Sequence, residues 1–216
     1  MSGGAAGILL VISAPSGAGK TTVCANLLAK NPSLVRAVTC TTRAPREGEE
    51  HGVDYYFLSE KEFLTRVDAG DFLEHALVYG RHYGTLKSEV LRWLREGKDV
   101  LLNIDVQGAA LLRKRAEEDE EIRDALVTVF LTPATPEELE LRLRSRGSDP
   151  DESIETRLEA AAKEVADAKS FDYLIISHSR EEDRRRMELV LEAERLRQPR
   201  ASVACLWERN GEGANS

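Results

Sequence analysis

Three consecutive residues, Lys20, Thr21 and Thr22, place an ammonium group and two hydroxyls directly after a turn of small residues. Gly17 and Gly19 in that turn let backbone N–H groups point inward, toward a bound anion. Such N–H groups can hold phosphate oxygens, a lysine can reach the β and γ phosphates of a nucleoside triphosphate, and a hydroxyl can ligate Mg²⁺. These residues therefore predict a nucleotide phosphate site, with Thr21 as the metal ligand.

This turn can bind phosphate only if a strand precedes it and a helix follows it. Ile8 to Ile12 is an uninterrupted apolar run, as in a buried parallel strand, and a helical stretch continues from Lys20 through Leu28. The pattern G-x-x-x-x-G-K-S/T is broken at its first position, so the turn alone also fits an ordinary glycine-rich connection. Its context favours a P-loop. The predicted triphosphate-binding residues are Ala14, Pro15, Ser16, Gly17, Ala18, Gly19, Lys20, Thr21 and Thr22.

Composition limits the chain to one substantial core, because 216 residues leave little room for a second full domain. The balance of 30 Lys and Arg against 38 Asp and Glu gives a net charge of −8, which argues against a nucleic-acid or membrane-surface binder. Cys24, Cys40 and Cys205 show no C-x-x-C spacing, so neither disulfides nor a zinc site is expected. With no signal-peptide or membrane-span pattern, we expect a cytoplasmic protein.

Three further apolar runs, at residues 100–104, 126–131 and 173–176, are each followed by a helix-like stretch. Alternation of buried strands and helices predicts an α/β fold with a parallel central sheet. Residues 36–86 differ in character, with short Thr, Tyr and Gly-rich runs around one helix. We expect that segment to form an inserted lobe.

The helix of the inserted lobe is bounded by clear signals. Ser59 and Glu62 form a capping box, and Gly70 ends the helix. Tyr55–Leu58 and Phe72–Val78 are predicted as strands of a small separate sheet.

A second excursion follows Leu131, and two helix-start signals define it. Thr135-Pro136-Glu137-Glu138 begins one helix, which stops near Gly147. Asp149-Pro150-Asp151-Glu152 begins another, with Ile154, Leu158 and Val165 on one apolar face. Two helices joined by a short hinge suit a movable lid.

Arg43 and Arg46 flank Pro45 and are followed by the acidic run Glu47-Gly48-Glu49. Two guanidinium forks at this spacing can address one phosphate. Taken alone, the segment is more often a solvated basic loop, since charged loops are common.

The chain resembles the guanylate kinase family over about residues 8–196. The resemblance is carried by six ordered motifs: S-A-P-S-G-A-G-K-T, T-T-R-A-P-R-E-G-E, H-G-V-D-Y-Y-F, F-L-E-H-A, Y-G-T and I-D-V-Q-G. It implies a three-layer P-loop NTPase fold and transfer of a phosphoryl group from ATP to GMP, and also to dGMP, with Mg²⁺. ATP and GMP are then the partners, with no nucleic acid or membrane. The oligomeric state is left open.

The resemblance also implies the acceptor site, in which two arginines and two tyrosines hold the GMP phosphate and a carboxylate reads the guanine edge. The implied GMP-binding residues are Thr39, Arg43, Arg46, Tyr55, Glu74, Tyr83, Thr85 and Asp105. The chemistry of Glu74 fits, because guanine presents N1–H and N2–H₂ as adjacent donors whereas adenine presents a bare N1 acceptor. Sites that recognise such polar groups can reject the wrong analogue by about 10⁴-fold.

Three arginines of the lid helices complete the implied catalytic set, which is Lys20, Arg142, Arg146 and Arg157. By resemblance they close over the ATP phosphates and stabilise charge on the transferred group. Without the resemblance, arginines on such polar helices are usually solvated.

Two positions depart from the family pattern. Asn103 stands where the family usually carries an acid, and Ser177-His178-Ser179 replaces an Asn-Asp pair near the adenine. An amide can donate and accept hydrogen bonds but cannot neutralise Mg²⁺. His178 itself is expected to be a surface loop residue rather than a base.

The predicted organisation is a P-loop core of residues 1–35 and 87–196 with a lid at about 136–168, a GMP-binding lobe of residues 36–86, and a tail of residues 197–216. Two alternatives remain. One is a non-catalytic binding module of the guanylate-kinase-like type, which typically lacks the P-loop lysine or the lid arginines. The other is a P-loop kinase with a different monophosphate acceptor, which the pair Glu74 and Thr85 argues against.

Overall fold

The structure is a computed structural model that describes residues 7–78, 80–145 and 151–197. Its larger sheet has five parallel strands in the order β2-β7-β1-β8-β9. The strands are β1 (Leu9–Ser13), β2 (Leu34–Arg36), β7 (Asp99–Asn103), β8 (Leu126–Pro133) and β9 (Tyr173–Ser177). Four of them coincide with the predicted apolar runs, and β2 is a short addition at one edge.

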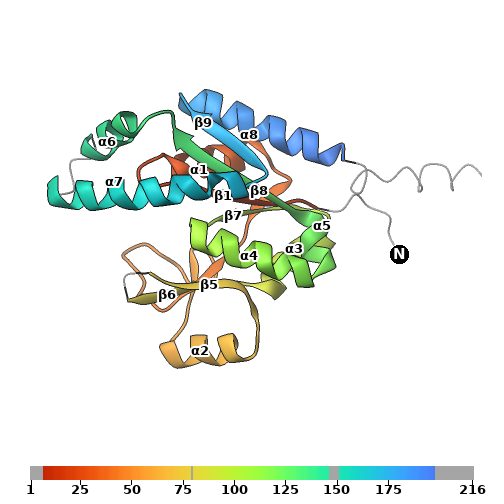
Figure 1. Ribbon diagram of the computed structural model, residues 1–216. Helices are drawn as coiled ribbons and strands as arrows, with labels where there is room; N and C mark the ends of the chain where they lie inside the picture. The colour runs from red at the N-terminus through yellow and green to blue at the C-terminus, as the bar shows by residue number, and fades with distance from the viewer. Residues whose placement is uncertain (1–6, 79, 146–150, 198–216) are drawn as a thin grey trace, which may run out of the picture.

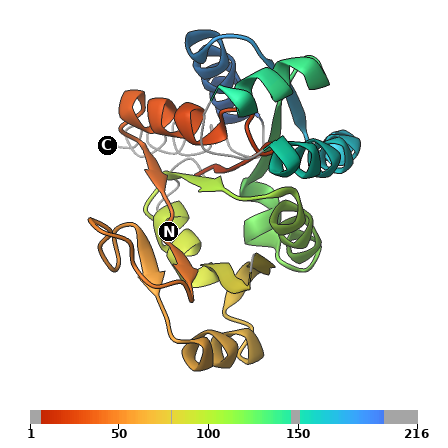
Figure 2. The same ribbon diagram turned by 90° about the vertical axis from the view of Figure 1, so that its left-hand side faces the viewer.

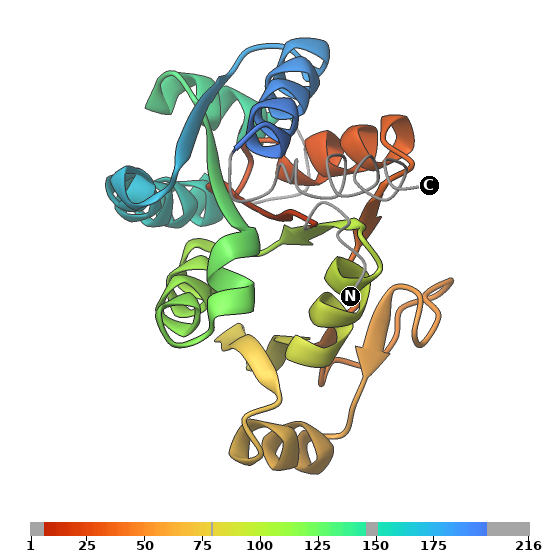
Figure 3. The same ribbon diagram turned by 90° about the vertical axis from the view of Figure 1, so that its right-hand side faces the viewer.

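The central strand β1 is buried on both faces, because its side chains alternate between two apolar cores. Leu10 and Ile12 pack with α1 and α8 on one face, whereas Leu9 and Val11 pack with α3, α4 and α5 on the other. Figure 3 shows these helices on opposite sides of the sheet. Their bounds are α1 (Lys20–Lys30), α3 (Lys87–Arg95), α4 (Val106–Glu118), α5 (Glu120–Ala125) and α8 (Arg180–Arg195). The predicted three-layer α/β fold is confirmed.

After the neighbouring strands β1 and β7, the chain continues on opposite faces of the sheet. The connection after β1 leads to α1 on one face, and the connection after β7 leads to α4 on the other. Such a switch leaves a crevice at the carboxyl ends of the two strands, where α/β sheets bind ligands. The predicted phosphate-binding turn and Asp105 both lie at this crevice.

A second sheet, of order β4-β3-β6-β5, forms the lower body in Figures 1 and 2. Its elements are β3 (Thr39–Thr41), β4 (Tyr55–Phe57), α2 (Glu60–Asp68), β5 (Phe72–Val78) and β6 (Arg81–Leu86). Phe63 of α2 is fully buried and stacks on Phe72 with 4.5 Å between ring centroids. The capping box of Ser59 and Glu62 is present, and Gly70 follows the helix with φ of 71°.

Helices α6 (Pro136–Arg144) and α7 (Asp151–Ala166) lie beside the larger sheet at its β8–β9 end (Figure 1). The α6 start is as predicted, because the Thr135 hydroxyl accepts the Glu138 N–H at 3.2 Å. Ile154 of α7 is buried in the core, and Leu158 packs against it. Val165 lines the same side of α7 but is 41% exposed. Among the described helices, none has the length and apolar character to cross a bilayer.

Candidate active site

The turn after β1 keeps its shape through left-handed glycines. Gly17 and Gly19 have φ of 94° and 95°, and the Ala18 N–H donates to the Pro15 carbonyl at 3.1 Å. Gly19 precedes α1, whose first turn has neither a capping side chain nor an acidic residue. The backbone N–H groups and the positive end of the helix dipole are therefore available to an anion.

Lys20 spans the crevice between β1 and β7. Its Nζ donates to the Ile104 carbonyl, which follows β7, at 2.6 Å. Burial lowers the pKa of Lys20, while the nearby charges of Cys24, Asp105 and Glu164 act in the opposite direction. The ammonium is thus held at the edge where the two strands end.

A pocket lies between the two sheets, next to the carboxyl end of β7. Five of the eight predicted acceptor residues line it together with Asn103, and these five are Thr39, Tyr55, Glu74, Tyr83 and Asp105. Four of them come from the four different strands of the smaller sheet, β3, β4, β5 and β6. The sheet therefore gathers residues that are far apart in the sequence around one cavity.

Glu74 is the buried acid of this pocket, with a relative exposure of 6%. The Thr85 hydroxyl donates to Glu74 Oε1 at 2.6 Å. Burial raises the pKa of the Glu74 carboxyl to about 7, against the Thr85 hydrogen bond, which lowers it, while the Asp105 charge raises it further. The Thr85 hydroxyl already donates its proton to Glu74, so it would have to break this hydrogen bond to donate to a ligand.

The two predicted phosphate-binding arginines both meet Glu49, which sequence analysis did not select. Arg43 donates from both terminal nitrogens to the Glu49 carboxylate at 2.9 Å each, with its guanidinium 5.4 Å from the Tyr55 ring centroid. Arg46 is exposed and donates its backbone N–H to the same carboxylate at 2.7 Å. Hydrogen bonds from Arg43 and the Arg46 backbone lower the pKa of Glu49 to about 2. A phosphate reaching Arg43 would therefore compete with an ionised carboxylate.

Helix α6 rests on the phosphate-binding turn. A Cβ on Gly17 would lie 2.6 Å from Leu143 Cδ2, so this glycine leaves room for the helix. Arg142 donates to the Ala18 carbonyl at 3.1 Å and to Ser177 Oγ at 2.9 Å. Arg157 is partly buried on α7, and Arg146 lies outside the described residues.

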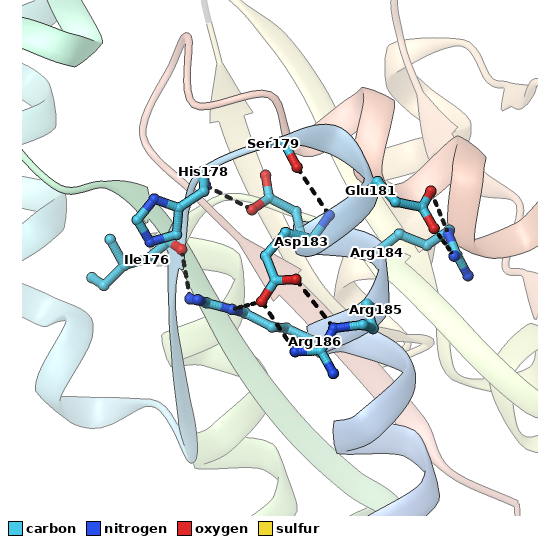
Figure 4. A network of polar contacts seen from close by, with 9 residues as sticks. Ile176, His178, Ser179, Glu181, Asp183, Arg184, Arg185 and Arg186 are labelled. Atoms are coloured by element: carbon cyan, nitrogen blue, oxygen red, sulfur yellow. Dashed lines mark hydrogen bonds and ion pairs between the residues drawn. The ribbon is translucent and has the colours of Figure 1, made fainter.

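The junction of β9 and α8 lines a second pocket beside the phosphate-binding turn. The Ser177 hydroxyl donates to Asp183 Oδ2 at 2.6 Å, and the His178 N–H donates to Asp183 Oδ1 at 2.9 Å. Figure 4 shows His178 and Ser179 beside Asp183, with Arg186 reaching the Ile176 carbonyl. His178 is exposed, as expected for a loop residue. Ser177, which departs from the family pattern, is therefore hydrogen-bonded to Asp183 in the first turn of α8.

Glu164 of α7 is a second acid that sequence analysis did not select. Its Oε2 is buried and has no hydrogen-bond partner. Burial raises the pKa of Glu164, whereas the charge of Lys20 lowers it. Glu164 is one of several acids on a polar helix, so no sequence signal distinguished it. Its place beside Lys20 depends on how α7 packs.

Each of the three comparisons with known proteins finds the guanylate kinase family. The guanylate kinase family model matches residues 7–194. A guanylate kinase of Clostridium perfringens is 42% identical over 206 residues, covering 95% of this chain and 92% of its own. A guanylate kinase of Cereibacter sphaeroides is 40% identical over 194 residues, covering 90% of each chain. The crystal structure of guanylate kinase from Anaplasma phagocytophilum has a TM-score of 0.72 and 31% identity, covering 98% of each chain.

Proposed function

The chain belongs to the guanylate kinase family and transfers a phosphoryl group from ATP to GMP, and we propose how its residues divide this reaction. The proposal rests on one observation, that the donor and acceptor sides meet at Ile104, directly after β7. Ile104 accepts the Lys20 hydrogen bond and also lines the pocket that holds Glu74. Donor and acceptor phosphates bound on the two sides would therefore meet at Lys20.

On the donor side, residues 14–22 hold the ATP phosphates through backbone N–H groups and the α1 dipole. Lys20 stabilises the charge that spreads over the transferred phosphoryl group, as phosphoryl transfer requires. Arg142 already contacts the phosphate-binding turn at Ala18. With Arg157, and with Arg146 by resemblance, it supplies positive charge when the lid of residues 136–168 closes.

On the acceptor side, the lobe of residues 36–86 binds GMP. Glu74 accepts the N1–H and N2–H₂ donors of guanine, and Asp105 lies across the same pocket. Tyr55, Tyr83 and the Arg43 fork hold the phosphate, since a planar guanidinium and two phenols match a dianion. The residues assigned here address the base and the phosphate, so we propose dGMP as an acceptor as well.

The residues beside the turn fit Mg²⁺. This ion binds through few protein ligands and keeps water and phosphate oxygens in its shell. Thr21 is exposed in the first turn of α1, beside the turn that would hold the phosphates. Thr21 would hold Mg²⁺, which when bound neutralises phosphate charge.

We place the reaction in the cytoplasm, where both nucleotides are available.

GMP affinity should depend on pH through Glu74. The carboxyl has a pKa of about 7 in the free protein, so it is mostly protonated below that pH and lacks its second acceptor oxygen. Since only the ionised fraction binds guanine well, the dissociation constant should rise about tenfold between pH 7.5 and pH 6. Calorimetric titration of GMP over this range measures it.

The phosphate of GMP titrates near pH 6 and needs a control. Glu74→Gln retains the phosphate effect and should lose the rest of the pH dependence. Equal pH profiles for the variant and the parent would contradict the assignment of Glu74.

Restoring an acid at position 103 should improve metal use. Asn103 is exposed at the end of β7 and lines the acceptor pocket. Asn103→Asp adds a negative charge there, so half-maximal activity should require several-fold less Mg²⁺. The readouts are a Mg²⁺ titration of the rate and direct titration of Mg²⁺ into the ATP complex. An unchanged Mg²⁺ requirement would separate this position from the metal.

The proposed function is tested by the dependence of ADP release on GMP. With Mg-ATP alone, release should stay at background, and GMP should raise it in proportion to GDP formed. ADP release that does not depend on GMP would indicate an ATPase. No ADP release would favour the non-catalytic binding module.

A further inference from the structure

Gly108 lies in the first turn of α4, where a glycine is unexpected. It is absent from the glycines with positive φ, so the backbone conformation does not require it. A helical glycine ordinarily costs about 1 kcal/mol relative to alanine. Neither conformation nor helix stability therefore explains this residue.

Space explains it. A Cβ built on Gly108 would lie 3.0 Å from Glu74 Oε2 and 3.5 Å from Glu74 Cδ. The same Cβ would lie 3.4 Å from Asp105 Oδ1, which accepts the Gly108 N–H at 2.7 Å. The missing side chain thus leaves room between two carboxylates of the acceptor pocket.

Glu74 has little freedom to retreat from a methyl group at this point. Its side chain is buried, and its other oxygen accepts the Thr85 hydroxyl at 2.6 Å. A methyl at position 108 would turn the carboxylate or shift it by a few tenths of an ångström toward the pocket. Either movement changes the position of the two acceptor oxygens relative to a bound base.

We propose that Gly108 is a specificity-positioning residue: the absence of a side chain there sets the position at which Glu74 meets the guanine edge. This inference rests on the proposed role of Glu74. Gly108 is not among the described residues that line the acceptor pocket, and in this proposal it acts through the Glu74 carboxylate, from the N-terminus of a helix of the P-loop core. Through this contact, a residue of the P-loop core positions Glu74, the residue of the acceptor lobe that reads the base.

The test is Gly108→Ala, assayed with GMP and with inosine monophosphate, whose base lacks the N2 amino group. The KM for GMP should rise about tenfold, equal to the loss of roughly one charged hydrogen bond. The preference for GMP over inosine monophosphate should fall at least several-fold. The KM for ATP should change less than twofold. An unchanged GMP KM and an unchanged preference would overturn the proposal.

A double-mutant cycle with Glu74→Asp separates this proposal from the proposed function. The shorter acid leaves room for the methyl, so Gly108→Ala should add little to the GMP KM in that background. Equal effects of Gly108→Ala in both backgrounds would overturn the steric claim, even if the single variant is unstable. If Glu74→Gln leaves selectivity intact, the role of Glu74 itself fails. If only Gly108→Ala is silent, Glu74 stands and the positioning role fails.

Discussion

Lys20→Ala is expected to lower kcat by about 10³-fold or more, the range for removing a preorganised group that stabilises transition-state charge. Lys20 is the cation that spans the crevice between β1 and β7, with its Nζ 2.6 Å from the Ile104 carbonyl. In the proposed mechanism, its loss removes a positive charge that stabilises the transferred phosphoryl group. A coupled assay for ADP release under saturating Mg-ATP and GMP measures the effect.

GMP binding to Lys20→Ala should remain measurable by calorimetry, because the acceptor pocket has its own residues. Lys30→Ala is the matched control, since Lys30 is exposed in the last turn of the same helix. It should leave kcat within about twofold, as exposed substitutions usually do. Loss of GMP binding in Lys20→Ala would mean that the donor and acceptor sides are wrongly assigned.

Glu74→Gln is expected to remove most of the discrimination between guanine and other bases. An amide offers one acceptor and one donor, so one of the two guanine donors meets an N–H instead of an oxygen. The loss of one charged hydrogen bond together with this mismatch should lower kcat/KM for GMP by about 10²-fold. The measurement is kcat/KM for GMP and AMP with each protein.

The matched control for this substitution is Glu60→Gln, at an exposed acid on α2 of the same lobe. It should leave both kcat/KM values unchanged. A Glu74→Gln variant that keeps its selectivity would show that another group reads the base.

The core of the fold could be predicted because its strands are buried on both faces and therefore apolar throughout. Leu9 to Ile12 have no measurable exposure, and the sequence shows them as one apolar run. Strands β2, β3 and β6 had no such signal. Arg81–Leu86 contains an arginine, a histidine and a glycine, and it is a strand because it pairs with β5 and β3.

Residue type and spacing predicted the turn before Lys20, and the family resemblance predicted Glu74 and Thr85, which the structure places in hydrogen-bond contact beside one pocket. The candidate site was not predictable where neighbours are distant in the sequence. Glu164 lies beside Lys20 only because α7 packs over the turn, and Gly108 meets Glu74 only because α4 packs beside β5. Packing of this kind leaves no periodic pattern in the sequence.

The most direct test of the account is the rate of ADP release from Mg-ATP with GMP, dGMP, AMP, UMP and CMP offered separately. The buried carboxylate of Glu74 should favour GMP over AMP by about 10⁴-fold in kcat/KM, with dGMP close to GMP and the pyrimidine nucleotides near background. Turnover of AMP as fast as that of GMP would contradict the assignment of the acceptor pocket.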